Sequence, residues 1–238
     1  MNILEAKNIT FSYDDDSIIL KNLSFHIKKG ELISIVGGSG CGKSTILKIL
    51  TGIEKNSQGN INTNDLSYMP QSDTLLPWRN ILDNILLPAE IKKENLKKAK
   101  EKAITYLKRL ELFDYAYNFP KDLSGGMKQR ICFIRALIND NELLLLDEPF
   151  SALDSITRED LQKWLLKNLS LLKKSMIFIT HDIDEAIFLS NRILVCSEKP
   201  ISFFKEFNIP PNINSEQKLQ LKKEILKAIK GESSYEQN

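Results

Sequence analysis

The sequence lacks the patterns that mark disulfide-linked, zinc-bound, nucleic-acid-binding or membrane-spanning proteins. Its three cysteines, Cys41, Cys132 and Cys196, are too scattered for a disulfide framework or a zinc site, which indicates a reducing compartment. The 33 basic and 31 acidic residues nearly balance, so we expect no nucleic-acid partner. No apolar run approaches the roughly 18–20 residues that cross a bilayer, and residues 1–11 lack the features of a secretory signal. We therefore expect that any work at a membrane requires another chain to hold this one there.

What the sequence does contain is an alternation of strand and helix patterns. Its 238 residues, 42% apolar and 27% charged, fit one large globular domain or one domain with an inserted lobe. Alternating apolar positions predict antiparallel strands at 3–11 and 18–27, joined by the acidic turn 14–16. The apolar run ELISIV (31–36) ends in glycines and leads into the helical pattern KSTILKIL (43–50). This order predicts a buried strand, a loop and a helix in series.

A charged helical region interrupts the alternation. Residues 90–112 are rich in Lys and Glu and predict one amphipathic surface helix. We therefore expect a mainly helical lobe at about 86–134. The core resumes with LLLLD (143–147) and MIFIT (176–180), which read as strands covered on both faces, and residues 216–230 predict a final amphipathic helix. The apolar face predicted for the charged helix consists of Ile91, Leu96, Ala99, Ala103, Leu107 and Leu110.

The stretch GGSGCGKST (37–45) matches the phosphate-loop pattern G-x-x-x-x-G-K-[ST]. Amide N–H groups of such a loop converge on phosphate oxygens, and the lysine reaches the β- and γ-phosphates while the serine hydroxyl binds Mg²⁺. The alternative is a plain glycine turn. A phosphate loop requires a strand before it and a helix after it, as predicted here, whereas a plain turn requires neither. Cys41 lies inside this loop, where we expect a thiol reagent to block nucleotide binding. The alternative is that Cys41 is only an inert small residue. The residues expected at the nucleotide are Gly37, Gly38, Ser39, Gly40, Cys41, Gly42, Lys43, Ser44 and Thr45.

A second acidic element fits the same chemistry. In LLLLDEP (143–149), an apolar strand delivers Asp147 to the Mg²⁺ shell. Glu148 follows at the strand tip, where a carboxylate can act as general base toward the attacking water. No N-K-x-D element for reading guanine is present in the sequence, so ATP is favoured over GTP.

The stretch LSGGMKQR (123–130) resembles the signature motif of the ATPase subunits of ABC transporters, and the resemblance covers nearly the whole chain. It implies a RecA-like P-loop NTPase core of α/β class, about 1–85 and 135–230, with an N-terminal antiparallel β subdomain and the helical subdomain inserted, all in one domain of 1–238. The family's other elements follow in order. They are Tyr13 as the aromatic that stacks on adenine, Gln71 in MPQSD as the Q-loop glutamine, SALD (151–154) as the D-loop and His181 as the switch histidine. Taken alone, Tyr13 also reads as a surface or core tyrosine and His181 as a helix cap.

The resemblance further implies how the site is completed. Two copies pair head to tail, with ATP between the phosphate loop of one and Ser124, Gly125, Gly126 and Asp154 of the other. Lys43, Gln71, Glu148 and His181 are the implied catalytic residues, and Ser44, Gln71 and Asp147 the implied Mg²⁺ ligands. The groove beside Gln71 receives a helix of a membrane permease, which holds the chain at the cytoplasmic face of the membrane.

Within the family, SDTLLPWRNILDNI (72–85) and HDIDEAIFLSNRILVCSEKP (181–200) resemble the nitrate, sulfonate and taurine importers, a branch that also includes suppliers of thiamine-precursor pyrimidines. Such importers also use an extracytoplasmic solute-binding protein. The alternative is a soluble ABC-type ATPase of DNA repair or translation, but the sequence shows no paired cassette, coiled-coil insertion or basic extension. A monomeric P-loop kinase is disfavoured because it leaves residues 123–130 without a role. An exporter is disfavoured because many exporters fuse the ATPase to a membrane domain.

Overall fold

The structure is a computed structural model that describes residues 1–14 and 17–231. The predicted acidic turn at 14–16 lies outside the described residues except for Asp14. The strands are β1 (Asn2–Ser12), β2 (Ile18–Lys28), β3 (Leu32–Gly37), β4 (Gln58–Thr63), β5 (Leu66–Met69), β6 (Leu143–Asp147), β7 (Ser175–Ile179), β8 (Arg192–Cys196) and β9 (Lys205–Asn208). The helices are α1 (Lys43–Leu50), α2 (Ile81–Ile91), α3 (Leu96–Arg109), α4 (Gly125–Ile138), α5 (Ser155–Leu172), α6 (Ile183–Leu189) and α7 (Ser215–Ile229).

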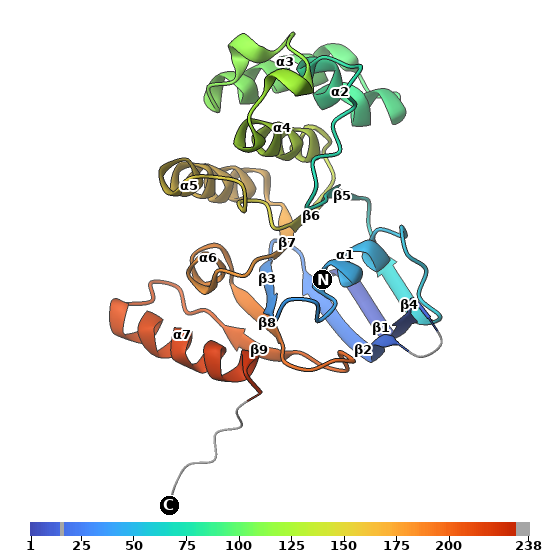
Figure 1. Cartoon of the computed structure of the whole chain (residues 1–238), viewed down its shortest axis with the longest axis vertical. Helices are drawn as coiled ribbons and strands as arrows, with labels where there is room; N and C mark the ends of the chain where they lie inside the picture. Colours follow the sequence, from blue (N-terminus) through green and yellow to red (C-terminus); the bar gives the residue numbers. More distant parts are fainter. Residues whose placement is uncertain (15–16, 232–238) are drawn as a thin grey trace, which may run out of the picture.

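Two sheets form the body of the protein (Figure 1). The smaller sheet is antiparallel in the order β2-β1-β4, as the alternation at 3–11 and 18–27 predicts. The larger sheet has the order β5-β6-β7-β3-β8-β9, and its first five strands are parallel while β9 is antiparallel to β8. Because parallel strands end at the same edge, the segments that follow β3, β5, β6 and β7 meet there.

The two central apolar strands are buried on both faces. Every residue of β6 and β7 is buried, and successive side chains enter opposite cores. One core lies under the helical lobe and α5, and the other lies under α1 and the smaller sheet. The continuous apolar runs at 143–147 and 176–180 are explained by this double coverage, as predicted. The first core receives Leu144, Leu146, Met176 and Phe178, and the second receives Leu143, Leu145, Ile177 and Ile179.

The helical lobe consists of α2, α3 and α4 at the end of the molecule opposite α7 (Figure 1). Its helices extend beyond 86–134 at both ends. Asn80 starts α2 early by accepting a hydrogen bond from the amide of Asp83 at 2.8 Å, and α4 continues to Ile138.

The single helix predicted at 90–112 is wrong. Lys93 has a φ of 55° and ends the first helix, and Asn95 caps the second by accepting from the amide of Lys98. This break turns Ile91 and Leu96 outward, to 72% and 47% exposure. The four later members of the predicted apolar face, Ala99, Ala103, Leu107 and Leu110, are buried. Within the described residues, no helix combines the length and apolar character needed to cross a membrane.

Candidate active site

The loop between β3 and α1 is built for close approach of a backbone to an anion. A Cβ on Gly37 would lie 2.6 Å from the carbonyl oxygen of Cys196, and one on Gly42, whose φ is +116°, would lie 2.6 Å from a methyl of Ile19. Both positions therefore require glycine. In the described part of the chain, the amides of residues 39–42 donate no hydrogen bond. Lys43 is buried, with 5% of the residue exposed. Its ammonium donates to the carbonyls of Gly37 and Gly38 at 3.0 and 2.8 Å. Free amides, a buried cation and a helix N-terminus are together able to bind a phosphate.

A hydroxyl and a carboxylate meet beside this loop. Ser44, in the first turn of α1, donates its hydroxyl hydrogen to Oδ1 of Asp147 at 3.1 Å. Burial raises the pKa of Asp147, and the hydrogen bond from Ser44 opposes that shift. Mg²⁺ binds such oxygen ligands and takes its remaining ligands from phosphates and water, so this pair fits the ion.

Glu148 lies where three strand ends converge. Its Oε2 accepts from Nε2 of Gln71 at 3.0 Å, and its Oε1 lies 2.6 Å from Nε2 of His181. Its amide donates to the carbonyl of Ile179 at 3.1 Å. The φ of Glu148 is +49°, a left-handed conformation that costs a non-glycine residue about 1 kcal/mol and persists where neighbours fix it. The structure thus brings Gln71, Glu148 and His181 together at the tips of β5, β6 and β7.

Tyr13 lies next to the phosphate loop, just past β1. Its hydroxyl is 3.3 Å from that of Thr45 on α1, and its ring forms a T-shaped pair with the ring of Phe11 at a centroid distance of 4.8 Å. The side chain is half exposed. Part of this aromatic side chain is therefore open to solvent close to the loop.

Ser124 and Asp154 begin helices elsewhere. Ser124 caps α4 by accepting from the amide of Met127 at 3.3 Å. Asp154 caps α5 by accepting from the amide of Thr157 at 3.1 Å, and this hydrogen bond holds the pKa of Asp154 below its ordinary value. Ser124, Gly125 and Asp154 are exposed. Over residues 1–14 and 17–231, no hydrogen bond or ion pair joins residues 124–126 or Asp154 to the phosphate loop.

The sequence of this chain has counterparts among known proteins. Residues 20–151 match the profile of the ABC transporter family. The chain belongs to that family. It is 37% identical to the formylaminopyrimidine import ATP-binding protein ThiZ of Halalkalibacterium halodurans, over 94% of each chain. It is also 38% identical to the aliphatic sulfonates import ATP-binding protein SsuB of Bacillus cereus, over 87% of each chain.

Solved structures of ABC cassettes have the same fold. A dimeric bacterial ABC transporter cassette, MJ0796, superposes with a TM-score of 0.80 at 30% identity, covering 87% of this chain and 99% of the other. A post-hydrolysis dimer of that cassette, bound to ADP and phosphate, gives a TM-score of 0.77. The predicted α/β fold with a P-loop NTPase core is confirmed, and membership of this family makes the chain an ATPase.

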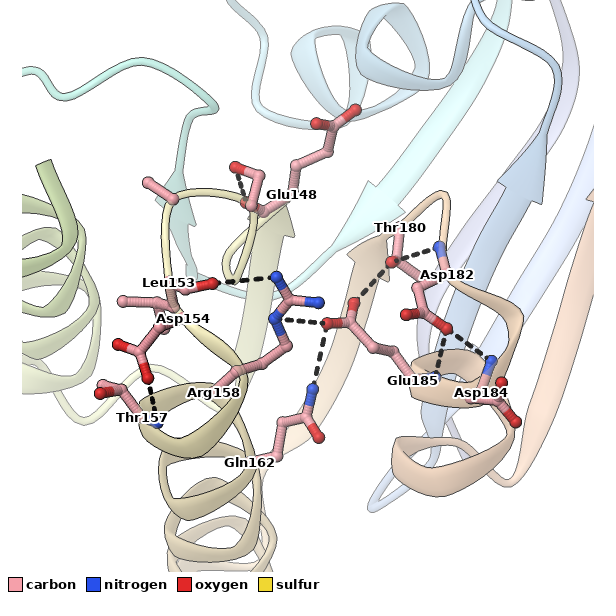
Figure 2. Close-up of polar contacts among 12 residues, drawn as sticks. Glu148, Leu153, Asp154, Thr157, Arg158, Gln162, Thr180, Asp182, Asp184 and Glu185 are labelled. Carbon is pink, nitrogen blue, oxygen red and sulfur yellow. Dashed lines mark hydrogen bonds and ion pairs between the residues drawn. The ribbon is translucent and has the colours of Figure 1, made fainter.

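The sequence patterns missed a set of polar residues behind the site, of which Gln129 and Glu185 are buried and Arg158 is partly buried. On α4, Gln129 donates to the carbonyl of Glu148 at 3.1 Å and accepts from the amide of Ala152 at 3.1 Å. On α5 and α6, Arg158 and Glu185 face each other (Figure 2). Gln129 lies inside LSGGMKQR, but its place in that motif did not reveal its hydrogen bonds to Glu148 and Ala152. Motif position alone indicated only the residues that the family resemblance assigns to the nucleotide.

Cys41 provides a chemical test of the loop. A hydrogen bond with Cys196 and the nearby Lys43 ammonium lower the pKa of the Cys41 thiol to about 6, although partial burial opposes the shift. Burial raises the pKa of Cys132, and the hydrogen bond to Cys41 together with burial raises that of Cys196. Iodoacetamide is expected to alkylate Cys41 first, because thiolate is the nucleophile. The rate should rise with pH through about 6 and then level off.

Peptide mass mapping measures this labelling. MgATP should protect Cys41, and alkylated chain should lose ATPase activity. Cys132 is the internal control, because it is buried away from the loop. Labelling of Cys132 before Cys41, or no protection by ATP, contradicts the expected environment of the loop.

Proposed function

We propose that this chain is the ATP-hydrolysing subunit of an importer for a small solute, working through a separate membrane permease of the nitrate, sulfonate, taurine or thiamine-precursor type. The observation that carries this proposal is the identity of 37% and 38%, over most of both chains, to two ATP-binding proteins named for import. The relatives give no support to the alternative of DNA repair or translation.

Nucleotide binding is assigned to the residues that surround the phosphate loop. The loop amides and Lys43 bind the phosphates, and the exposed ring of Tyr13 stacks on adenine. Ser44, Asp147 and Gln71 hold Mg²⁺, which when bound neutralises charge on the phosphates. The contact between Ser44 and Asp147 at 3.1 Å supports this assignment.

Hydrolysis is assigned to the cluster at the strand tips. The Glu148 carboxylate orients water and takes its proton, which a general base does from within hydrogen-bond reach. His181 and Gln71 hold that carboxylate through contacts of 2.6 and 3.0 Å. In this scheme both also position the γ-phosphate and water, so that Glu148 faces the reacting atom.

The second half of each site comes from a partner copy in this proposal. Ser124, Gly125, Gly126 and Asp154 are assigned to the partner's nucleotide. Ser124 and Gly125 are exposed at the N-terminus of the 14-residue helix α4, which favours an anion. The similar cassette MJ0796 forms dimers, which supports the pairing of two copies. ATP then stabilises the closed dimer, and hydrolysis removes the γ-phosphate that joins the halves.

A groove beside Gln71 is assigned to the permease. It has a volume of about 510 Å³ and lies between the helical lobe and α1. Ile91 lines the groove and is 72% exposed. Trp78, four residues after the lining residue Thr74, is also 72% exposed. A short permease helix seated there holds the chain at the cytoplasmic face of the membrane and receives the closing motion. An extracytoplasmic solute-binding protein delivers the solute to the permease. The apolar part of the groove is lined by Ile53, Tyr68, Pro70, Leu87, Pro88 and Ile91.

Ile91→Glu tests this assignment. The buried core does not contain Ile91, so basal ATPase of the purified chain should remain within about twofold. Uptake of labelled sulfonates, nitrate and pyrimidines should be lost in a deletion strain that carries the variant. A charge in an apolar interface costs several kcal/mol when it is desolvated without a partner.

Leu171→Glu is the matched control. Leu171 is 71% exposed on α5 and does not line the groove. This variant should restore uptake like wild type. Normal uptake with Ile91→Glu contradicts the docking groove. A deletion strain that keeps uptake of all the solutes named above contradicts the importer function itself.

A further inference from the structure

Glu185 on α6 is a buried carboxylate that connects separate elements. It is 8% exposed, and burial raises its pKa against the opposing hydrogen bonds. Its Oε2 accepts from the hydroxyl of Thr180 at 2.6 Å, and its Oε1 accepts from Nε2 of the Gln162 side chain at 3.1 Å. Figure 2 shows Gln162 and Arg158 of α5 both pointing toward this carboxylate. A buried charge persists only where such partners meet it.

One side of this carboxylate fixes the segment that carries His181. The strand β7 ends at Ile179 and α6 begins at Ile183, so His181 lies in a short connection. Thr180, directly before His181, donates to Glu185 and accepts from the amide of Asp182, directly after it, at 3.0 Å. Glu185 therefore anchors the backbone on both sides of the histidine.

The other side reaches the turn at 151–154. Nε of Arg158 lies 3.7 Å from Oε1 of Glu185, and its Nη2 donates to the carbonyl of Leu153 at 2.9 Å. Leu153 directly precedes Asp154, the residue that caps α5. One guanidinium thus bridges the turn and the carboxylate (Figure 2).

The ion pair between Arg158 and Glu185 is not closed. Among the described residues, the buried Nε of Arg158 has no hydrogen-bond partner, since 3.7 Å exceeds hydrogen-bond length. A buried donor without a partner is costly, and a movement of less than about 1 Å would supply one. The contact is therefore sensitive to small displacements of the 151–154 turn.

We propose that Glu185 is a positioning residue for ATP hydrolysis, which with Arg158 couples the position of the 151–154 turn to the orientation of His181. The inference rests on the proposed function, in which His181 acts at the γ-phosphate and Asp154 faces a partner copy. When the turn moves against the partner, Arg158 closes on Glu185, and Thr180 carries the change to His181. Neither Glu185 nor Arg158 touches the nucleotide in this scheme.

The first test is Glu185→Gln in the full chain, with Asp184→Asn as the matched control. The glutamine keeps the size but removes the charge that faces Arg158. Loss of a supporting partner behind a reacting group costs about tenfold or more in activity. We expect kcat for ATP hydrolysis to fall by that factor, while KM changes less than about twofold because the phosphate loop is untouched.

Asp184 is the adjacent carboxylate on α6, but it pairs with Lys218 and Lys222 at the surface. Asp184→Asn should keep the wild-type kcat. A wild-type kcat in folded Glu185→Gln, or an equal loss in both variants, overturns the proposal.

A second pair of variants tests the link through Thr180. Thr180→Ser keeps the hydroxyl that donates to Glu185, whereas Thr180→Val keeps the shape and removes it. We expect the serine variant to keep kcat within about twofold and the valine variant to lose about tenfold, again with little change in KM. If Thr180 served only stability, the two variants would have the same kcat per folded molecule. That result overturns the proposal. This pair also decides the matter if Glu185→Gln does not fold.

His181→Ala separates failure of the inference from failure of the proposed function. Hydrolysis should be slow in this variant, and adding Glu185→Gln should reduce the residual rate no further, because residues that act as a unit are not additive. A further tenfold loss shows that Glu185 does not act through His181 and overturns the inference alone. A wild-type rate in His181→Ala overturns the role of His181, and the inference with it.

Discussion

Glu148→Gln is expected to bind ATP, to hydrolyse it at least about 100-fold more slowly than wild type, and to accumulate as an ATP-bound dimer. General-base catalysis contributes about 10²- to 10⁴-fold in enzymes. The amide keeps the size of the carboxylate but cannot accept a proton from water. The phosphate loop, Lys43 and Ser44 remain unchanged, so ATP should still join two copies. Phosphate release and light scattering with MgATP measure the two effects.

Glu142→Gln is the matched control for that prediction. Glu142 directly precedes β6 and Glu148 directly follows it, so the two substitutions remove equal charge at opposite ends of one strand. Glu142 pairs with Lys29 on the surface, and its variant should hydrolyse ATP at the wild-type rate. Unimpaired hydrolysis by Glu148→Gln would falsify the assignment of the base. A monomer at saturating MgATP would contradict dimerisation through the nucleotide.

The parts of the site that sequence predicts are those where chemistry depends on neighbours in the chain. Residues 37–45 follow an apolar strand and open a helix, so their placement is local. Asp147 ends a strand, and Glu148 follows it; the apolar run of that strand predicts burial on both faces, and β6 has that burial. The contact of Glu148 with Gln71 and His181 additionally requires the strand order β5-β6-β7, which the family resemblance implies but local patterns do not contain.

The network behind the site was not predictable from the same patterns. Arg158, Gln162 and Glu185 are polar residues on helices, where the usual interpretation is an exposed face. The burial of Gln162 and Glu185, and the contact of Arg158 with Glu185, depend on the approach of α5 to α6, which are separated in sequence by β7. The local signal that this stretch of α6 faces inward is its apolar residues, of which Ile183, Ala186, Ile187 and Leu189 are buried.

The error at 90–112 has a similar cause. A helical period continues through Ile91 and Leu96 only if the backbone between them stays helical. The left-handed Lys93 and the cap at Asn95 break it. Asn is a strong N-cap residue and so was a usable signal. Periodicity alone placed two exposed side chains on the apolar face.

Mixing Lys43→Ala with Ser124→Arg is expected to restore a nucleotide site that neither variant has alone. Lys43→Ala removes the cation from the phosphate loop, and Ser124→Arg places a bulky side chain where the partner's phosphate binds. A heterodimer of the two has one site with both defects and one with neither, because each copy gives a different surface. Dimers carrying two different affinity tags should therefore form with MgATP and hydrolyse it, at about half the wild-type rate per dimer if the sites act independently.

The matched control places both substitutions in one chain and pairs it with wild type. Every site of that heterodimer has one defect, although its composition is identical. It should neither assemble with ATP nor hydrolyse it. Ser124→Arg also removes a helix cap worth about 1 kcal/mol, so each variant is first checked for an unchanged fold by circular dichroism. Equal activity of the two heterodimers would show that residues 124–126 do not complete the neighbour's site. Activity confined to the arrangement in trans would place one nucleotide between two copies of this chain.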